Sequence, residues 1–78
     1  MWQVYIVKCA DGSLYTGITT DVEKRLSVHN AGKGAKYTRV RLPVEMVYDL
    51  ACGDRSAASK EEYRIKKLSR EQKLQLID

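Results

Sequence analysis

Cysteine is scarce in this sequence, and a long apolar run is missing altogether. The two cysteines, Cys9 and Cys52, are too few and too far apart for a zinc motif, so we expect reduced thiols in a cytoplasmic protein. No apolar run approaches the roughly 20 residues that a membrane span needs. The N-terminal MWQVYIVK also lacks the basic segment and cleavage site of a signal peptide. We therefore expect no association with a membrane.

A large core is excluded by length, because 78 residues predict one small domain, residues 1–78. A hydrophobic share of 44% nevertheless argues against disorder. Acidic residues are absent between Lys33 and Arg41, and this basic stretch is interleaved with glycine. Such a pattern favours contact with phosphate groups, through Lys33, Lys36, Tyr37 and Arg39. A second basic group, residues 60–73, contains glutamates as well and is more typical of a solvated surface.

The order of predicted elements is ββαβαα. Residues 2–9 and 13–19 are rich in β-branched and aromatic residues and predict two strands joined at Asp11-Gly12. Thr20 and Glu23 form a capping box, which predicts a helix from Asp21 to about Gly32, followed by a loop over 33–43. A third strand is expected over 44–51. A helix is then expected from Arg55 or Ser56 to Leu68, and a second capping box predicts a last helix from Ser69 to about Ile77. This is an α+β domain with a three-stranded antiparallel or mixed sheet flanked by helices.

The length of the first turn decides which side chains share a face of the sheet. A two-residue turn would place Tyr5 and Tyr15 on opposite faces. A three-residue loop, with Gly12 in the left-handed conformation, would pair Tyr5 with Gly17 and bring both tyrosines to one face. It would also gather Trp2, Val4, Ile6, Leu14, Thr16 and Ile18 on the other face as a core. We favour the three-residue loop, in which Gly17 leaves room beside the ring of Tyr5.

The first helix carries two polar residues near its apolar side. Val22 and Leu26 are expected to pack on the sheet, with Arg25 and His29 along the edge of the same contact. A single histidine beside an apolar face is usually structural. An arginine one turn away would repel a protonated imidazole, and an anion such as a phosphodiester would relieve that repulsion.

The second long helix supplies carboxylates. Glu61 projects near the middle of its apolar arc (Ala57, Ala58, Ile65 and Leu68), and Glu62 lies near the rim. A carboxylate at the rim can hold a hard cation such as Mg²⁺ in a shared cleft. The alternative is an ordinary helix pair between Glu62 and Lys66.

Taken together, these residues resemble the GIY-YIG nuclease domain, over essentially the whole chain. The resemblance is carried by Tyr5 within V-Y-I, the Tyr15-Thr16-Gly17 triplet, Arg25, His29-Asn30, and a glutamate within E-Y-R-I-K. It is strongest toward small single-domain bacterial members, through L-Y-T-G-I-T, G-K-G-A-K and the E-Y segment. The sequence departs from the motif where Val4-Tyr5-Ile6 replaces Gly-Ile-Tyr and where Thr16 replaces Ile.

The resemblance implies an endonuclease-like fold and an active site formed by Tyr5, Tyr15, Arg25, His29 and Glu62, with Gly17 as the motif glycine. It implies hydrolysis of a phosphodiester with one divalent metal, Mg²⁺ or Mn²⁺, on Glu62. Tyr15 or His29 would accept the proton of the attacking water, and Arg25 would stabilise the pentacovalent phosphate. Tyr5 would position the water or the phosphate.

Three functional hypotheses follow. The first is a DNA endonuclease acting on branched, flapped or nicked DNA. The second is a nucleic-acid-binding module with weak or no cleavage, and the third is a protein-interaction domain. Retention of all five site residue types argues against the third. DNA is favoured over RNA as the partner, and a protein partner that directs the domain to its substrate fits a chain ending soon after Glu62.

Overall fold

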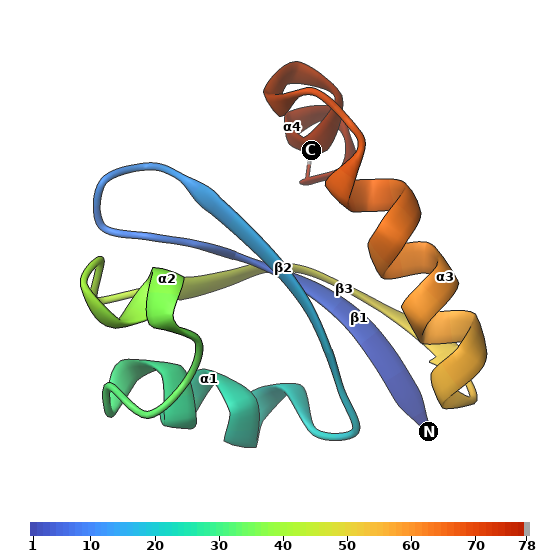
Figure 1. Ribbon diagram of the computed structural model, residues 1–78, viewed down its shortest axis with the longest axis horizontal. Helices are drawn as coiled ribbons and strands as arrows, with labels where there is room; N and C mark the ends of the chain where they lie inside the picture. The colour runs from blue at the N-terminus through green and yellow to red at the C-terminus, as the bar shows by residue number, and fades with distance from the viewer. Residues whose placement is uncertain (78) are drawn as a thin grey trace.

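The computed structural model describes residues 1–77, and Asp78, the last residue of the predicted domain, lies outside the described residues. The elements in chain order are β1 (Trp2–Lys8), β2 (Leu14–Thr19), α1 (Val22–Asn30), α2 (Lys36–Arg39), β3 (Glu45–Gly53), α3 (Arg55–Lys66) and α4 (Arg70–Ile77). The strands form one antiparallel sheet in the order β2-β1-β3, with helices on both sides (Figure 1). The predicted α+β fold is confirmed. Among residues 1–77, no helix has the length and apolar character needed to cross a membrane.

The β1–β2 hairpin has the predicted three-residue loop. Tyr5 pairs with Gly17 and Val7 pairs with Tyr15. Gly12 has a φ of 85°, a left-handed conformation that costs glycine little because it has no Cβ. Tyr5 and Tyr15 therefore lie on the same face of the sheet, and this parity positions the site described below.

Both faces of the sheet are buried, whereas the sequence predicted a core on one face and the tyrosines on the other. Val4 and Ile6 pack with Ile65 of α3, and α4 completes this layer. On the opposite face, Tyr5 and Val7 form a second buried cluster that α1 covers with Val22 and Leu26. Four of the five predicted site residues, from β1, β2 and α1, thus belong to a packed layer on this face, whereas Glu62 lies on α3.

The helix bounds differ from the predicted ones in three places. The N-cap of α1 is Asp21 rather than Thr20, because the Asp21 carboxylate accepts a hydrogen bond from the backbone N–H of Lys24 at 3.1 Å. The predicted loop over 33–43 contains the one-turn helix α2, which is too short to show a helical period in the sequence. Helix α3 ends at Lys66 and not at the predicted Leu68. Its buried residues are Ala58 and Ile65, whereas Ala57, predicted to lie on the apolar face, is exposed.

Side-chain hydrogen bonds fix the end of α1 and the start of α4. The Asn30 side chain accepts from Val44 N–H at 2.8 Å and donates to Val44 C=O at 3.0 Å, so one amide attaches the end of α1 to the chain entering β3. The second predicted capping box is present: Ser69 and Gln72 exchange hydrogen bonds of 2.9 and 3.2 Å between side chain and backbone.

Candidate functional site

A chain of hydrogen bonds runs through the layer between β1 and α1. The hydroxyl of Tyr5 lies 2.8 Å from Nε2 of His29, and Nδ1 of His29 lies 2.8 Å from Oγ1 of Thr38 in α2. Tyr5, His29 and Thr38 are all buried, with exposed fractions of 1% or less. The prediction that His29 lies at the edge of the helix contact is therefore wrong. The imidazole is at the centre of the layer because α2, which the sequence did not reveal, covers its outer side.

This chain fixes the tautomer of His29. Thr38 donates its hydroxyl hydrogen to the Ala35 carbonyl at 3.0 Å, so its oxygen is free to accept from Nδ1–H of His29. Nε2 then carries no proton and accepts from the Tyr5 hydroxyl. With this assignment every side-chain polar atom of the Tyr5–His29–Thr38 hydrogen-bond chain has a partner, and the imidazole is neutral.

Arg25 provides the positive charge of the layer. Its Nε donates to the Tyr5 oxygen over 3.4 Å, and its side chain is half-buried. Burial lowers the pKa of His29, and the charge of Arg25 lowers it further. Burial also raises the pKa of Tyr5, although the hydrogen bond from Arg25 acts in the opposite direction. Both buried groups are therefore neutral near pH 7, and the guanidinium is the charge available to an anion.

Tyr15 joins the same group through its ring. Its centroid lies 5.6 Å from that of His29 in an edge-to-face arrangement. Unlike Tyr5, Tyr15 is half-buried, so it can contact a ligand. Gly17 has the predicted role: a Cβ there would lie 2.6 Å from the Tyr5 oxygen and 2.8 Å from Cζ. Alanine at position 17 would displace the phenol.

Gly34 makes a similar close approach, which was not among the sequence predictions. A Cβ at this position would overlap Nδ1 of His29 and lie 2.9 Å from Cγ and Cε1. Gly34 and Thr38 thus hold the imidazole from the side opposite the sheet. The G-K-G-A-K segment was the available signal, but it predicted a phosphate-contacting loop and a family resemblance, not a close approach to His29.

Glu62 lies on α3, on the other side of the edge strand β2 from α1. Its side chain is half-buried, and Oε2 lies 3.4 Å from Nζ of Lys66, the helix pair considered as the alternative. Burial is the main cause that raises the pKa of Tyr5, and the charge of Glu62 adds to it, so the carboxylate acts electrostatically on the buried layer. Glu61 pairs instead with Arg64. The structure brings Tyr5, Tyr15, Arg25 and His29 together, and places Glu62 across the strand without a direct contact to them.

The chemistry of the donors limits how a metal could be held. Within residues 1–77, no three His, Cys, Asp or Glu side chains are grouped as a metal site would require. A single carboxylate suits Mg²⁺, which keeps several waters and commonly takes further ligands from substrate phosphate. Glu62 therefore fits a divalent ion that binds together with a substrate.

The basic stretch lies on the outer side of the site. Lys33, Lys36 and Arg39 are exposed on α2 and the loop before it. Tyr37 is partly exposed, but its ring is already engaged: Cζ of Arg41 lies 3.9 Å from its centroid, and Tyr15 stacks against it at 6.0 Å. A base can stack on Tyr37 only on surface that these two side chains leave open.

We expect His29 to make the fold less stable in acid. The pKa of His29 in the native protein is below 6.5, whereas the unfolded chain takes up the proton near 6.5, so unfolding is accompanied by proton binding. The free energy of unfolding should therefore decrease as pH falls below about 6.5, by at most about 1.4 kcal/mol per pH unit from this residue. Urea denaturation between pH 7 and pH 5 measures the slope. His29→Gln should show a flatter dependence, and equal slopes would contradict the prediction.

Comparison with known proteins agrees with this architecture. The family model of the GIY-YIG catalytic domain matches residues 1–75. A UPF0213 protein of Staphylococcus haemolyticus is 59% identical over 75 residues, covering 96% of this chain and 92% of its own. One from Desulfotalea psychrophila is 58% identical over 77 residues, covering 97% of this chain and 70% of its own. The solution structure of the UPF0213 protein BH0048 from Bacillus halodurans is similar, with a TM-score of 0.62 and 50% identity over 99% of this chain and 83% of that one.

Proposed function

Because the chain belongs to the GIY-YIG catalytic domain family, a family of nucleases, we propose that it is a metal-dependent DNA endonuclease. The observation that supports this most is the composition of the site. A buried hydrogen-bond chain links Tyr5, His29 and Thr38. Three half-buried side chains accompany it: the phenol Tyr15, the cation Arg25 and the anion Glu62. A pure scaffold needs neither a guanidinium held against a phenol nor two glycines that make room for side chains. We also propose a preference for branched, flapped or nicked DNA.

Burial divides the roles among these residues. Tyr5 and His29 are too buried to touch a substrate, so they position Arg25 and support Tyr15. Arg25 would contact the non-bridging oxygens of the phosphate and stabilise the charge of the pentacovalent transition state. In its deprotonated, phenolate form, Tyr15 would orient the attacking water and accept its proton. A bond from phosphorus to the water oxygen forms, the bond from phosphorus to the 3′-oxygen breaks, and the leaving 3′-oxygen takes a proton from solvent.

Glu62 would hold the divalent ion, Mg²⁺ or Mn²⁺. The bound ion would neutralise a phosphate oxygen and stabilise the leaving 3′-oxygen. Lys33, Lys36 and Arg39 would contact flanking phosphates without reading the sequence.

The test is cleavage of labelled duplex, single-stranded, flapped and branched DNA in the presence of Mg²⁺ or Mn²⁺. We expect cleavage that EDTA abolishes and that Glu62→Gln lowers by about a hundredfold or more. Glu61→Gln is the matched control, since Glu61 is adjacent, equally exposed at 24%, and paired with Arg64. Full activity of Glu62→Gln would refute the metal role. Binding without cleavage under either metal would favour the second candidate, a nucleic-acid-binding module.

A further inference from the structure

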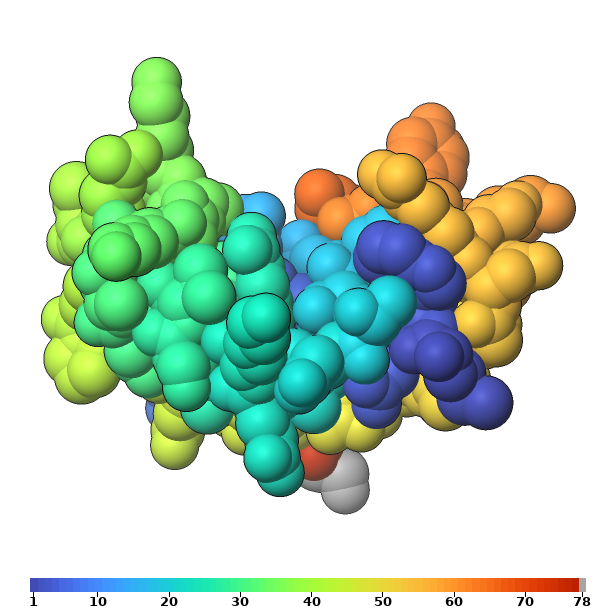
Figure 2. Space-filling model, turned by 90° about the horizontal axis from the view of Figure 1, so that it is seen from below, coloured from blue at the N-terminus to red at the C-terminus, as the bar shows by residue number. Residues whose placement is uncertain are grey.

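A pocket of about 220 Å³ opens along the edge strand β2, beside the buried Tyr5–His29 layer. Four elements line it: β2 contributes Leu14, Tyr15 and Thr16, α2 contributes Tyr37, and α3 and α4 contribute Lys66 and Lys73. Figure 2 shows the hollow between the green α2 side and the orange α3 side of the molecule. Lys66 and Lys73 belong to the second basic group, whose mixed charges predicted a solvated surface. Lys73 is in fact half-buried.

Thr16, one of the residues that line the pocket, has a hydroxyl that lacks a hydrogen-bond partner in the described part of the chain. The residue is 2% exposed, and among residues 1–77 its Oγ1 is the one buried side-chain atom for which no hydrogen-bond partner is found. A buried hydroxyl without a partner is unfavourable, whereas valine has the same shape without that cost. Because Thr16 is also one of the residues that line the pocket, a polar atom of a bound ligand is the partner that we assign to this hydroxyl.

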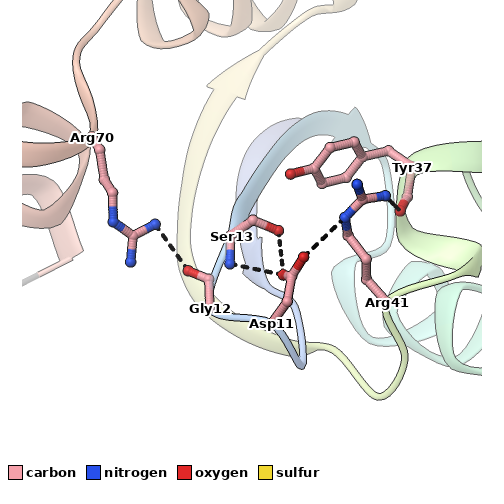
Figure 3. Close-up of polar contacts among 6 residues, drawn as sticks. All are labelled: Asp11, Gly12, Ser13, Tyr37, Arg41 and Arg70. Carbon is pink, nitrogen blue, oxygen red and sulfur yellow. Dashed lines mark hydrogen bonds and ion pairs between the residues drawn. The ribbon is translucent and has the colours of Figure 1, made fainter.

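The walls of the pocket are held in place from the hairpin loop (Figure 3). Arg41 contacts Asp11 at 3.0 Å and the Tyr37 carbonyl at 2.8 Å, which ties α2 to the loop. Arg70 of α4 donates to the Gly12 carbonyl at 2.9 Å. Tyr37 and Lys73, on opposite sides of the pocket, are therefore both fixed to the same three-residue loop, and the pocket is already formed without a ligand.

Resting on the proposed function, we infer that this pocket holds one unpaired nucleobase of the substrate strand. Its apolar walls are Leu14 and the parts of Tyr15 and Tyr37 that their mutual stacking and Arg41 leave open, and such surfaces contact a base. The single hydroxyl of Thr16 is suited to one polar atom on a base edge. Lys66 and Lys73 carry the positive charge that the adjacent phosphates require.

The pocket also sits next to the candidate catalytic groups. Tyr15 lines the pocket and contacts His29, and Lys66 pairs with Glu62 at 3.4 Å. A base in the pocket would therefore place a neighbouring phosphate close to Tyr15 and Glu62. A base stacked within a duplex cannot enter such a pocket without being extruded from the helix. A pocket of this kind therefore favours single strands, flaps and branches as substrates.

The test separates base contact from charge and from catalysis. Binding of two fluorescein-labelled single strands about ten nucleotides long, one of thymidine and one with the same backbone but no bases, is measured by anisotropy in EDTA. We expect the abasic strand to bind about tenfold more weakly. Thr16→Val should weaken binding of the thymidine strand about threefold to tenfold and leave the abasic strand unchanged. Thr20→Val, an exposed neighbour, is the control.

The melting temperature of Thr16→Val distinguishes a ligand-binding hydroxyl from a structural one. We expect the variant to be at least as stable as the native protein, because a buried group without a partner is removed. A loss of stability with unchanged binding would mean a bound water only, and would overturn the inference. Equal affinity for the two strands would also overturn it. DNA cleavage that ignores unpaired bases would refute this pocket alone, whereas base-dependent binding without cleavage would refute the catalytic proposal alone.

Discussion

Arg25→Ala should lower the rate of DNA cleavage by about a hundredfold or more, the cost of losing one transition-state contact of about 3 kcal/mol. The guanidinium is the positive charge held against the Tyr5 phenol, and it is half-buried, so it can reach a phosphate. Its removal also takes away the hydrogen bond that opposes the raised pKa of Tyr5. Single-turnover kinetics on the best DNA substrate would measure the effect on the chemical step.

Two variants control this experiment. Lys24→Ala removes an exposed charge from the preceding residue of α1 and should retain nearly full activity. Arg25→Lys keeps the charge but loses the planar fork, and should fall between the native protein and Arg25→Ala. If Arg25→Ala and Lys24→Ala lost activity equally, the effect would be a general loss of positive charge, and the assigned role of Arg25 would be wrong.

The fold was predictable where local patterns determine it. The parity of Tyr5 and Tyr15 followed from the loop length, because a strand alternates its side chains with a period of two. The cap of the last helix followed from Ser69 and Gln72. The choice of Glu62 over Glu61 as the candidate metal ligand came from the rim position and the sequence resemblance. The structure adds that Glu61 pairs with Arg64 and Glu62 with Lys66.

The environment of His29 was not predictable in the same way. Thr38 reaches the imidazole from the one-turn helix α2, and Gly34 reaches it from the loop before that helix. The position of both depends on tertiary packing, and no period in the sequence indicates these contacts. The same reason hid the pocket at Thr16. Alternation assigned Thr16 to the core face, but whether its hydroxyl has a partner depends on side chains from α2, α3 and α4 that are distant in sequence.

Gly34→Ala should destabilise the fold by about 2 kcal/mol and impair cleavage, because its methyl group would overlap the His29 ring. The backbone itself is not the cause, since Gly34 is not among the glycines with positive φ. A double-mutant cycle with His29→Ala isolates the contact. Where the ring is absent, Gly34→Ala should be neutral or slightly stabilising, as it reduces the entropy of the unfolded chain. Urea denaturation of the four proteins measures this coupling. An equal cost in both backgrounds would show that Gly34 is required for some reason other than room for the imidazole.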